Sequence, residues 1–530
     1  MTLRSLRVSF TALGLIALAL PGCGSEGSSG GSGGGTGATG GSGGFGGGFG
    51  GGGVGGATGG TGGATGGTGG STGGTGGATG GTGGATGGTG GATGGTGGST
   101  VASPEVYFWG DFDTAGKEQV GAFQGTTKGL LALSGLAGGN NVYDVAPSPD
   151  GTKVAVAGRD TATSNPVLNV YAKDGSGSPT SVATMPAANR PIESIAWSPD
   201  GKWIAYTAEG DMDNVMSLYV VPAAGGTAPK RLSQTPATSL GVTEFAWAFS
   251  VSTSNAYIAY TGDMVTNGVY GLWVVDALAA SPSPVEIVTQ AELGGSAGTK
   301  DVQDRLGWDS QNRIYFTSDF QVDDSFRLYR ASATGTGREQ VPGTALKNTG
   351  GTVDAEVGTF GFNAAGTKLA FSCDTPTAGV YQVLVLDLAQ TTAAAVTSVT
   401  AAPASGVSYG PSFFSAISWS PDGTKLGVVA DWPVGSGAVD NAFGAWVVPS
   451  SGTPGATLLL GAPTSTTFDV DDVVFSKDST RVFVRGDLVT DTQKDVYVTS
   501  DLATANQSPA SKVLEAAVSG GTVQGIQIAP

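Results

Sequence analysis

The chain has 530 residues, of which 94 are glycine and only 13% are charged, with a formal net charge of −17 and no histidine. The lack of histidine excludes Ser-His-Asp and Cys-His catalysis and every His-ligated metal site. Arg4, Arg7 and Glu26 are the charged residues of the first hundred positions, so the acidic surplus lies in 101–530. Such a domain repels phosphate backbones, and we expect no nucleic-acid partner.

The first 22 residues have the pattern of a secretory signal. A basic start is followed by an apolar run from about Val8 to Leu20, which is too short for a membrane-spanning helix. The run ends in Leu20-Pro21-Gly22-Cys23, which resembles a bacterial lipobox, although Pro21 departs from the usual small residue. We therefore predict a lipoprotein signal peptide at 1–22 and lipidation of Cys23, with a plain secretory signal as the alternative.

The predicted lipid anchor also predicts a location. It places the chain in a bacterial cell envelope, anchored to a membrane by its lipid chains. Gly24 stands where some lipoproteins carry the aspartate that retains them in the inner membrane. Its identity favours the outer membrane, on the periplasmic side or the cell surface.

A low-complexity segment separates the anchor from the rest of the chain. Beyond Cys23, residues up to 104 are mostly glycine, threonine, alanine and serine, with phrases such as Ala64–Gly70 repeated. A segment with so few side chains to bury cannot offset its conformational entropy, so 23–104 is expected to be a disordered linker. The second cysteine, Cys373, then has no disulfide partner and is expected to be a buried thiol.

One phrase recurs in the remaining residues, 105–530. It is clearest at Trp419–Val429 and returns at Trp197–Tyr206 and around Pro147–Val154. Each copy is an apolar strand, a Pro-Asp-Gly turn and a second alternating strand. Proline fixes φ at the first turn position, aspartate bonds to local backbone and glycine supplies the positive φ that closes the hairpin. The phrase predicts a fold and names no substrate.

Large or apolar residues before each turn mark the repeats, which are roughly 50–60 residues long, as in propellers. These anchors are Pro147, Trp197, Trp247, Trp308, Phe362, Trp419, Phe475 and Ile528. We expect the tryptophans among them to pack blade on blade, with carbohydrate stacking as the less favoured alternative.

Within the second repeat, four strands are predicted, which we call a to d. They are Ile192–Trp197, Trp203–Thr207, Ser217–Val221 and Lys230–Ser233. The chain ends in a strand a without successors at Val523–Pro530, and 105–530 opens with strands b, c and d without a strand a, at Val106–Trp109, Gln119–Phe123 and Leu130–Leu133. Joined, they make one composite blade that closes the ring without an exposed edge. We predict an all-β, eight-bladed propeller of four-stranded antiparallel blades, with seven blades as the alternative.

The Ser-Pro-Asp-Gly hairpins resemble TolB-like propeller repeats, which are related in shape to WD-type repeats. The resemblance covers most of 105–530, with good turn motifs at Ser148–Gly151, Ser198–Gly201 and Ser420–Gly423. It implies the fold, and the same blades serve many tasks. TolB itself carries an extra N-terminal α/β domain that this chain replaces with a linker, so the role of TolB in its envelope complex is not carried over. Propeller peptidases and pectin-fragment lyases depend on histidines that this chain lacks.

An aspartate follows each predicted strand b. The set is Asp111, Asp160, Asp211, Asp263, Asp319, Asp374, Asp431 and Asp487. In a four-stranded meander these positions circle the end of the ring opposite to the Pro-Asp-Gly turns. The functional interpretation is a rim that binds a cation or a basic partner. The structural one, favoured by the regular recurrence, is that each aspartate caps its own b–c loop.

Irregular acidic clusters are better candidates for a ligand site. Three of them add carboxylates near the predicted ring: Asp211 with Asp213, Asp319 with Asp323 and Asp324, and Asp469 with Asp471 and Asp472. Clustered carboxylate oxygens suit calcium, although none has the EF-hand spacing. We expect no other cofactor.

Two functions remain open. The first is a membrane-anchored, envelope or surface-displayed propeller that acts as a binding or scaffold module for a protein, peptide or glycan, and works as a monomer. The second is a histidine-independent enzyme that uses carboxylates or a metal on polysaccharide in the propeller channel. The absence of a catalytic motif and the long linker favour the first.

Overall fold

A computed structural model describes residues 104–529, all within one compact unit of the chain. Residues 1–103, which include Cys23 and the predicted signal and linker, lie outside the description. So do the gaps at 126, 137–141, 187–189, 211–213, 236–240, 253–255, 295–298, 345, 347–354, 376–379, 390–395, 401–416, 433–441, 453, 462–468, 516, 520 and 530.

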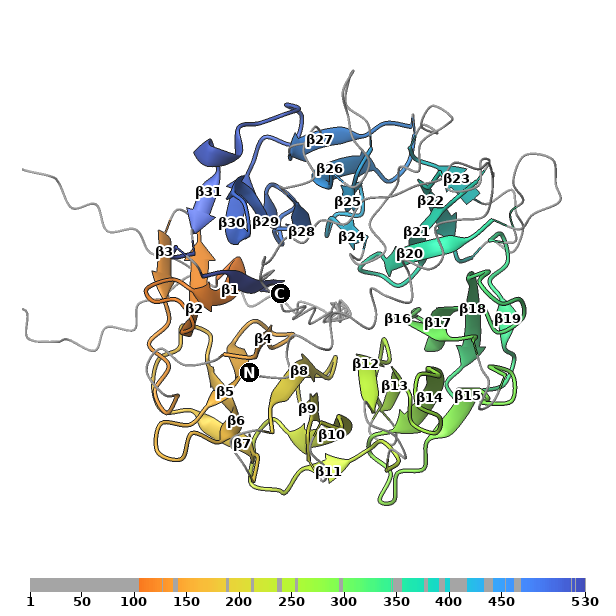
Figure 1. The fold of residues 1–530 in the computed structure, drawn as a ribbon, viewed down its shortest axis with the longest axis horizontal. Coiled ribbons are helices and arrows are strands. Elements are labelled where there is room, and N and C mark those ends of the chain that lie inside the picture. The colour runs from red at the N-terminus through yellow and green to blue at the C-terminus, as the bar shows by residue number, and fades with distance from the viewer. Residues whose placement is uncertain are drawn as a thin grey trace, which may run out of the picture. The chain divides into compact units, whose positions relative to one another are not determined.

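The described strands form eight four-stranded antiparallel sheets, which confirms the eight-bladed propeller (Figure 1). The innermost strands, a, are β4 (Asp144–Pro147), β8 (Ile192–Trp197), β12 (Val242–Trp247), β16 (Val302–Trp308), β20 (Val357–Phe362), β24 (Ser418–Trp419), β28 (Val470–Phe475) and β32 (Val523–Ile528). The strands b are β5 (Lys153–Arg159), β9 (Trp203–Ala208), β13 (Tyr257–Gly262), β17 (Arg313–Ser318), β21 (Lys368–Cys373), β25 (Lys425–Ala430), β29 (Val482–Thr490) and β1 (Val106–Asp111).

The third and fourth strands complete each blade towards the periphery. The strands c are β6 (Pro166–Ala172), β10 (Ser217–Pro222), β14 (Gly271–Asp276), β18 (Arg327–Ser332), β22 (Gln382–Asp387), β26 (Gly444–Pro449), β30 (Gln493–Thr499) and β2 (Glu118–Gln124). The outermost strands, d, are β7 (Thr180–Thr184), β11 (Lys230–Arg231), β15 (Val285–Val288), β19 (Glu339–Gln340), β23 (Val396–Ser398), β27 (Thr457–Leu460), β31 (Val513–Glu515) and β3 (Thr127–Leu130). We number the blades from one (β4–β7) to seven (β28–β31), and blade eight is the composite one.

The composite blade joins the two ends of the propeller. Its strand order is β3-β2-β1-β32, and Val106 pairs with Ile528 across the ladder. The prediction of a shared blade is therefore confirmed, but its outermost strand was placed wrongly. We expected that strand at Leu130–Leu133, whereas β3 is Thr127–Leu130, because Gln124 already pairs with Thr127 in a tight turn. The length of a hairpin loop fixes the register, and the sequence pattern did not reveal how short this loop is.

The eight anchor residues all end their strands a, as the repeat analysis predicts. Consecutive strands a contact one another around the whole ring, from β4 to β32 and back to β4. Trp197 donates its indole N–H to the Ala146 carbonyl of the preceding blade at 2.9 Å. Trp247, Trp308 and Trp419 repeat the same bond to Ala196, Ala246 and Gly361. These tryptophans pack blade on blade, as expected, and are not a carbohydrate-stacking set.

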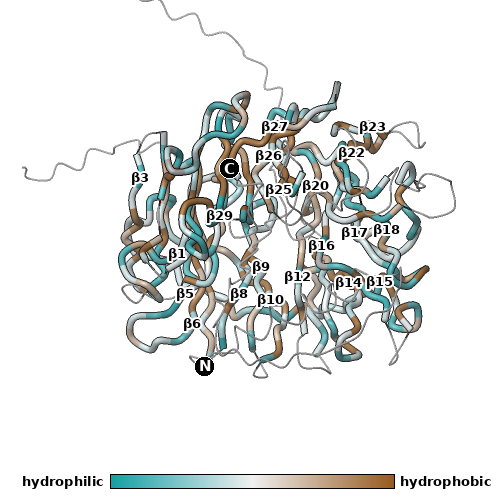
Figure 2. The backbone as a smooth tube through the Cα atoms, turned by 45° about the horizontal axis from the view of Figure 1, so that its top comes forward, coloured by the Kyte–Doolittle hydropathy of each residue, from teal (hydrophilic) through white to brown (hydrophobic). Residues whose placement is uncertain are grey.

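Apolar side chains fill the spaces between neighbouring blades. One cluster joins Ala157 and Leu168 of blade one to Ile195 and Trp197 of blade two, and similar clusters recur around the ring. Figure 2 shows apolar stretches along the strands and hydrophilic stretches in the connections between them. Cys373 is fully buried in β21, and burial raises the pKa of its thiol well above the usual range, so it is an inert core residue.

The turns between strands a and b have the chemistry that their sequence predicts. In the turn after β24, Ser420 donates its hydroxyl to Asp422 Oδ1 at 2.6 Å, and Gly423 adopts a φ of 70°. The Lys425 backbone N–H donates to the Ser420 hydroxyl and begins the next strand. The same bonds hold the turn after β28, where Ser479 takes the left-handed position in place of glycine.

The meander gives the ring two unlike ends. We call the end with the a–b and c–d connections the turn face, and the end with the b–c and d–a connections the loop face. The connection between β8 and β9 on the turn face covers only 198–202, whereas that between β23 and β24 covers 399–417. No helix among the described residues is long and apolar enough to span a membrane.

Candidate functional site

The aspartates that follow strands b clasp the beginning of strand a in their own blade. The Asp263 N–H donates to the Gly241 carbonyl, and the Gly241 N–H returns a bond to Asp263 Oδ1 at 2.7 Å. Asp319 pairs in the same way with Asp301. Asp374 with Glu356 and Asp487 with Asp469 complete the set of two-way pairs. We call this two-way pair of hydrogen bonds a clasp. Each clasp adds one side-chain hydrogen bond to the loop-face end of the ladder between strands a and b.

The second carboxylate oxygen of these aspartates serves the b–c connection. Asp319 Oδ2 accepts the Asp324 N–H at 3.0 Å, and Asp487 Oδ2 accepts the Thr492 N–H at 3.1 Å. Both donors have positive φ, 59° for Asp324 and 65° for Thr492, so the loop turns back onto the carboxylate. One side chain thus joins the b–c loop to the start of strand a, a longer reach than the local cap that the sequence suggests.

In blade two the equivalent residue is a glutamate. Glu209 directly follows β9, its N–H donates to the Pro191 carbonyl, and its Oε2 accepts the Asn214 N–H at 2.9 Å. Asn214 has a φ of 61°, as in the other loops. Asp211, which the sequence analysis assigned to this role, lies outside the described residues together with Asp213. Glu209 could have been found from its distance to the turn, which matches that from Asp422 to Asp431.

Most of the clasp carboxylates are inaccessible. Asp263 and Asp319 are 0% and 1% exposed, and Asp111, Asp374, Asp431 and Asp487 are also buried. Asp160 is half-buried, and its Oδ1 accepts the N–H groups of Ala162 and Thr163 within its own loop. A partner that approaches the loop face therefore meets the loops that these side chains hold, rather than a ring of free carboxylates.

One of the three acidic clusters does converge in space. Asp319, Asp323 and Asp324 place ligand oxygens within 4.8 Å of one another, with Asp319 buried and the other two exposed. Burial raises the pKa of Asp319, and the Asp323 charge adds to the effect. Burial also raises the pKa of Glu356 in the next blade, helped by the charges of Asp374, Asp324 and Asp319. The boundary between blades four and five is thus a concentrated negative site whose oxygens suit a hard cation.

The cluster of blade seven carries its own counter-charges. Arg485, which is buried, contacts Asp471 at 3.0 Å and Asp472 at 2.7 Å. Lys494 contacts Asp471 at 2.6 Å. The backbone N–H of Asp469 donates to Asp487 Oδ1. Burial raises the pKa of the Asp469 carboxyl to about 6. These ion pairs place two cations against the carboxylates of Asp471 and Asp472.

A structural feature that the sequence analysis missed lies at the start of the strands a. The pairing of strands a and b shifts register within β8, β12, β16, β20, β28 and β32. In β8 and β12 the shifts fall at Glu193-Ser194 and at Thr243-Glu244, which are half-buried. Such bulges re-aim side chains, and here they concentrate polar residues near the loop face. The sequence signal for such a bulge is a pair of adjacent polar residues inside a strand in which apolar and polar residues otherwise alternate.

Three exposed apolar side chains lie on the loop face. Six large apolar side chains are more than a third exposed in the described part of the chain. Val265, Val322 and Val489 lie in b–c connections or at the tip of a b–c hairpin, and Leu130, Val285 and Val513 lie in outermost strands. None of the described a–b connections carries one.

One family model and several solved structures are similar to parts of this chain. The family model described as WD domain, G-beta repeat, matches residues 179–219. Curated protein sequences give no match. A solved structure of a putative TolB from Agrobacterium tumefaciens is similar at 15% identity, over 56% of this chain and 89% of that one, with a TM-score of 0.32.

Two further solved structures are similar at lower identity. The β-propeller domain of Myceliophteria thermophila Cps50 (Swd1) has 9% identity, over 65% of this chain and 93% of that one, with a TM-score of 0.39. A puromycin-hydrolyzing peptidase of Mycobacterium tuberculosis has 12% identity over 67% of this chain, with a TM-score of 0.41, and this chain spans about half its length, 52%. Its eight closed four-stranded blades show that the chain is a β-propeller, and one of its repeats matches the WD-type model.

Proposed function

We propose that this chain is an envelope-anchored or surface-displayed scaffold that binds a macromolecular partner, a protein, a peptide or a glycan, on its loop face. The fold itself suggests a protein-binding or scaffold module. The observation that carries the choice of face is the position of the exposed valines. Val265 and Val322, 48% and 50% exposed, stand on the b–c connections of the adjacent blades three and four.

The surroundings of these valines suit an interface. The exposed carboxylates of Asp323 and Asp324 follow Val322 directly, so an apolar contact and a negative rim lie together. Such a combination fits a partner with an apolar centre and basic residues at its edge. The clasps of Asp263 and Asp319 tie the b–c connections that carry these valines to the starts of strands a. We expect this constraint to reduce the conformational entropy that the connections lose when a partner binds.

A pair of matched variants tests this proposal. The full chain is recovered from its producing cells as wild type, as Val265→Asp with Val322→Asp, and as Val285→Asp in the outermost strand of blade three. We expect the loop-face variant to lose at least about ten-fold of the co-recovered partner, since a charge is placed in an apolar contact. The outer-strand variant should retain it. Equal recovery with all three chains would refute the choice of face.

A cation at the boundary of blades four and five is a second candidate, and the convergence of Asp319, Asp323 and Asp324 favours it. Calcium would supply charge neutralisation between the carboxylates and fix the b–c loop of blade four. Calcium at a hundred times its dissociation constant stabilises a protein by about 2.7 kcal/mol. The test is the melting temperature with calcium or with chelator, for wild type and Asp323→Asn. An unchanged melting temperature at millimolar calcium would remove this candidate, and with it the metal-assisted enzyme.

The membrane anchor is part of the same proposal and rests on the sequence around Cys23. If the anchor is correct, mass spectrometry of the N-terminal peptide from producing cells should detect a lipid-modified Cys23. Replacement Cys23→Ser should release the chain from the membrane fraction. A wild-type chain that is already found free of membranes, with an unmodified Cys23, would contradict the anchor and leave the loop-face proposal standing.

A further inference from the structure

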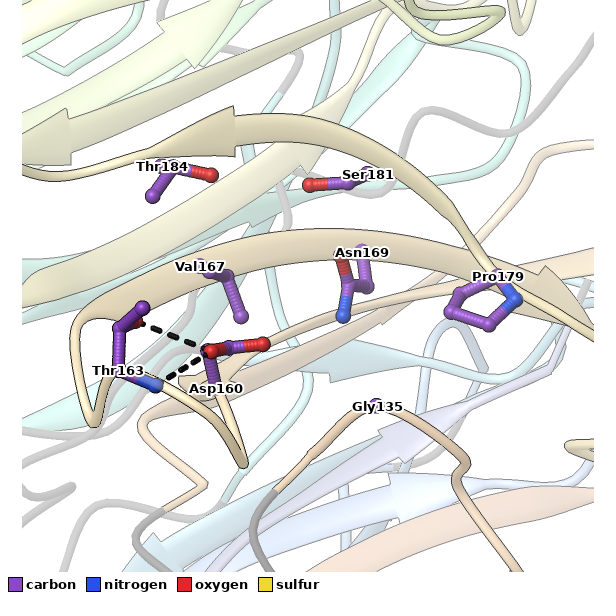
Figure 3. Close-up of a pocket in the computed structure, with 8 residues that line it drawn as sticks. All are labelled: Gly135, Asp160, Thr163, Val167, Asn169, Pro179, Ser181 and Thr184. Atoms are coloured by element: carbon purple, nitrogen blue, oxygen red, sulfur yellow. Dashed lines mark hydrogen bonds between the residues drawn. The ribbon is translucent and has the colours of Figure 1, made fainter.

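A cavity of about 350 Å³ opens on blade one, beside the segment that connects the composite blade to it (Figure 3). Its walls come from β6, β7, the b–c connection of blade one and the segment that follows β3. Its size is at the lower end of small-molecule sites and is sufficient for one or two sugar rings. The exposed valines Val265 and Val322 belong to other blades, so this cavity is a separate feature.

Asn169, at the centre of this cavity, is buried and lacks a partner for one atom. The residue is 4% exposed and lies in the middle of β6, where strands carry mostly apolar residues. Its Oδ1 has no hydrogen-bond partner among the described residues. In Figure 3 the side chain projects from β6 into the cavity. A buried polar atom without a partner costs about 1–3 kcal/mol, so its retention calls for a ligand or for water.

A neighbouring tyrosine fixes which way the amide faces. The Tyr171 hydroxyl donates its proton to the Ser134 carbonyl at 2.9 Å, and burial raises the pKa of Tyr171 to about 12, so this proton is retained. The hydroxyl can then only accept from Asn169, whose Nδ2 lies 3.2 Å away. Because the nitrogen is used in this way, the Asn169 oxygen is the atom left without a partner.

Four further polar residues line the cavity, namely Asp160, Thr163, Ser181 and Thr184. Asp160 accepts the Thr163 hydroxyl at 3.0 Å through Oδ1, and its other oxygen points along the cavity towards Asn169 (Figure 3). Ser181 and Thr184 of β7 are exposed, and their hydroxyls point towards each other across the opposite side. Together these groups present acceptors on one wall and hydroxyls, which both donate and accept, on the other.

The apolar part of the wall comes from Val167, Pro179 and Gly135. Gly135 has a φ of 82°, and a Cβ there would lie 3.6 Å from the Pro179 ring and 3.9 Å from Asn169 Nδ2. A Cβ would fit at these distances, so it is the positive φ, which lets the segment after β3 turn here, that favours glycine. Apolar C–H groups of a ligand would contact Val167 and Pro179 while its polar groups reach the amide and the carboxylate.

We propose that this cavity binds a neutral polyhydroxylated ligand, a sugar or a sugar unit of a glycan. A hydroxyl group donates and accepts, and so satisfies both Asn169 Oδ1 and the hydroxyls of Ser181 and Thr184. An ammonium ion only donates and would leave the β7 hydroxyls unused as donors. An anion is repelled by the Asp160 carboxylate. The inference is independent of the loop-face partner, since it uses different blades and a small ligand.

Saturation-transfer NMR on the full chain tests this inference with glucose, galactose, mannose and N-acetylglucosamine as separate probes, and with ethanolamine for comparison. Inorganic phosphate, which has no carbon-bound protons, is followed instead through the width of its phosphorus-31 line. We expect saturable binding of at least one sugar. Asn169→Leu should weaken it about five- to ten-fold, and Thr184→Val about three-fold, as for the loss of one neutral hydrogen bond. The matched control is Thr397→Val in β23, another exposed threonine of an outermost strand, which should bind like wild type.

Thr184 is exposed, so its variant remains informative even if Asn169→Leu fails to fold. The inference is overturned if no sugar gives a saturable signal, which would leave water as the occupant of the cavity. It is equally overturned if ethanolamine or phosphate binds in place of the sugars, or if Thr184→Val and Thr397→Val weaken sugar binding to the same extent. Loss of the loop-face partner in the valine variants described above would leave the sugar result unchanged.

Discussion

Carboxylates on the two faces of the propeller lie in opposite environments. On the turn face, the Ser420 hydroxyl and the Thr424 N–H lower the pKa of Asp422, and equivalent bonds from Ser476 and Thr480 lower that of Asp478 to about 2. The pKa values of Asp150 and Asp200 move the same way. On the loop face, burial raises the pKa values of Asp144, Asp319, Glu356, Asp469 and Asp495. Asp160 and Glu292 are exceptions, with lowered pKa values.

This difference shows that carboxylates have different structural roles on the two faces. The turn-face carboxylates stay at the surface and each organise a few neighbouring residues. The loop-face carboxylates are drawn inside, where they join segments that are far apart in the sequence. Burying carboxylates in this way costs folding free energy. The loop face also displays the longer connections. Both features are typical of a surface that binds a partner.

The largest effect should come from breaking the ring that carries both faces. Removal of 523–530 deletes β32 with its buried Val523 and Ile526, and exposes the edge of β1. We expect a loss of more than about 5 kcal/mol of unfolding free energy, with loss of the cooperative transition. Denaturant unfolding followed by tryptophan fluorescence measures it. Removal of Pro530 alone is the control, and a stable 523–530 deletion would contradict ring closure.

Two arginines of blade seven compare the faces directly. Arg485 near the loop face is 6% exposed between Asp471 and Asp472, whereas Arg481 at the turn face is 28% exposed against Glu105. Arg485→Met should cost about 3–5 kcal/mol, because it removes the buried cation that contacts both Asp472 and Asp471, although Asp471 keeps its contact with Lys494. Arg481→Met should cost no more than about 1 kcal/mol. Equal costs in chemical denaturation would remove the energetic distinction between the faces.

The aspartates themselves give a smaller contrast. Asp263→Ala removes a fully buried carboxylate that accepts the Gly241 N–H, and about 2–3 kcal/mol should be lost. Asp422→Ala removes an exposed turn aspartate, with an expected loss of about 1 kcal/mol. Thermal unfolding of both variants provides the test. A costlier Asp422 variant would show that the turns, and not the clasps, dominate stability.

The strands and turns were predictable because their signals are local. The anchors at Trp197 and Trp419, the turn at Ser420–Gly423 and the closing strand at the C-terminus all follow from residues adjacent in the sequence. The sequence predicted the aspartates of the clasps but not their partners. The bond from Gly241 to Asp263, for example, joins residues whose proximity depends on strand pairing. Glu209 departs from the aspartate pattern of the other blades, so the sequence pattern pointed to Asp211 instead. The cavity around Asn169 was not predictable, because its walls come from separate segments between residues 135 and 184 that meet only when the strands of blade one pair and the segment after β3 folds against them.

Changes of pH should move the stability contributions of the two faces in opposite directions. Burial raises the pKa of Asp144 to about 7, so its contribution to stability is complete below the unfolded pKa near 4 and falls as pH rises towards 7. Relative to Asp144→Asn, wild type should lose about 2 kcal/mol between pH 5 and 8. The Asp478 contribution is present above pH 4 and is lost as pH falls towards 2. Stability curves for Asp144→Asn and Asp478→Asn test both signs. Parallel curves for wild type and Asp144→Asn would contradict the buried carboxyl.

The central claim is that the loop face, and not the turn face, meets the partner of this chain. A photo-crosslinking amino acid placed at Val322 on the loop face, or at Thr424 in the turn after β24, tests it in the producing cells. Both positions are exposed, so the two chains differ in the face that carries the probe. We predict a discrete higher-mass adduct from position 322 and none from position 424. An adduct from position 424 alone, or from neither position, would contradict the claim.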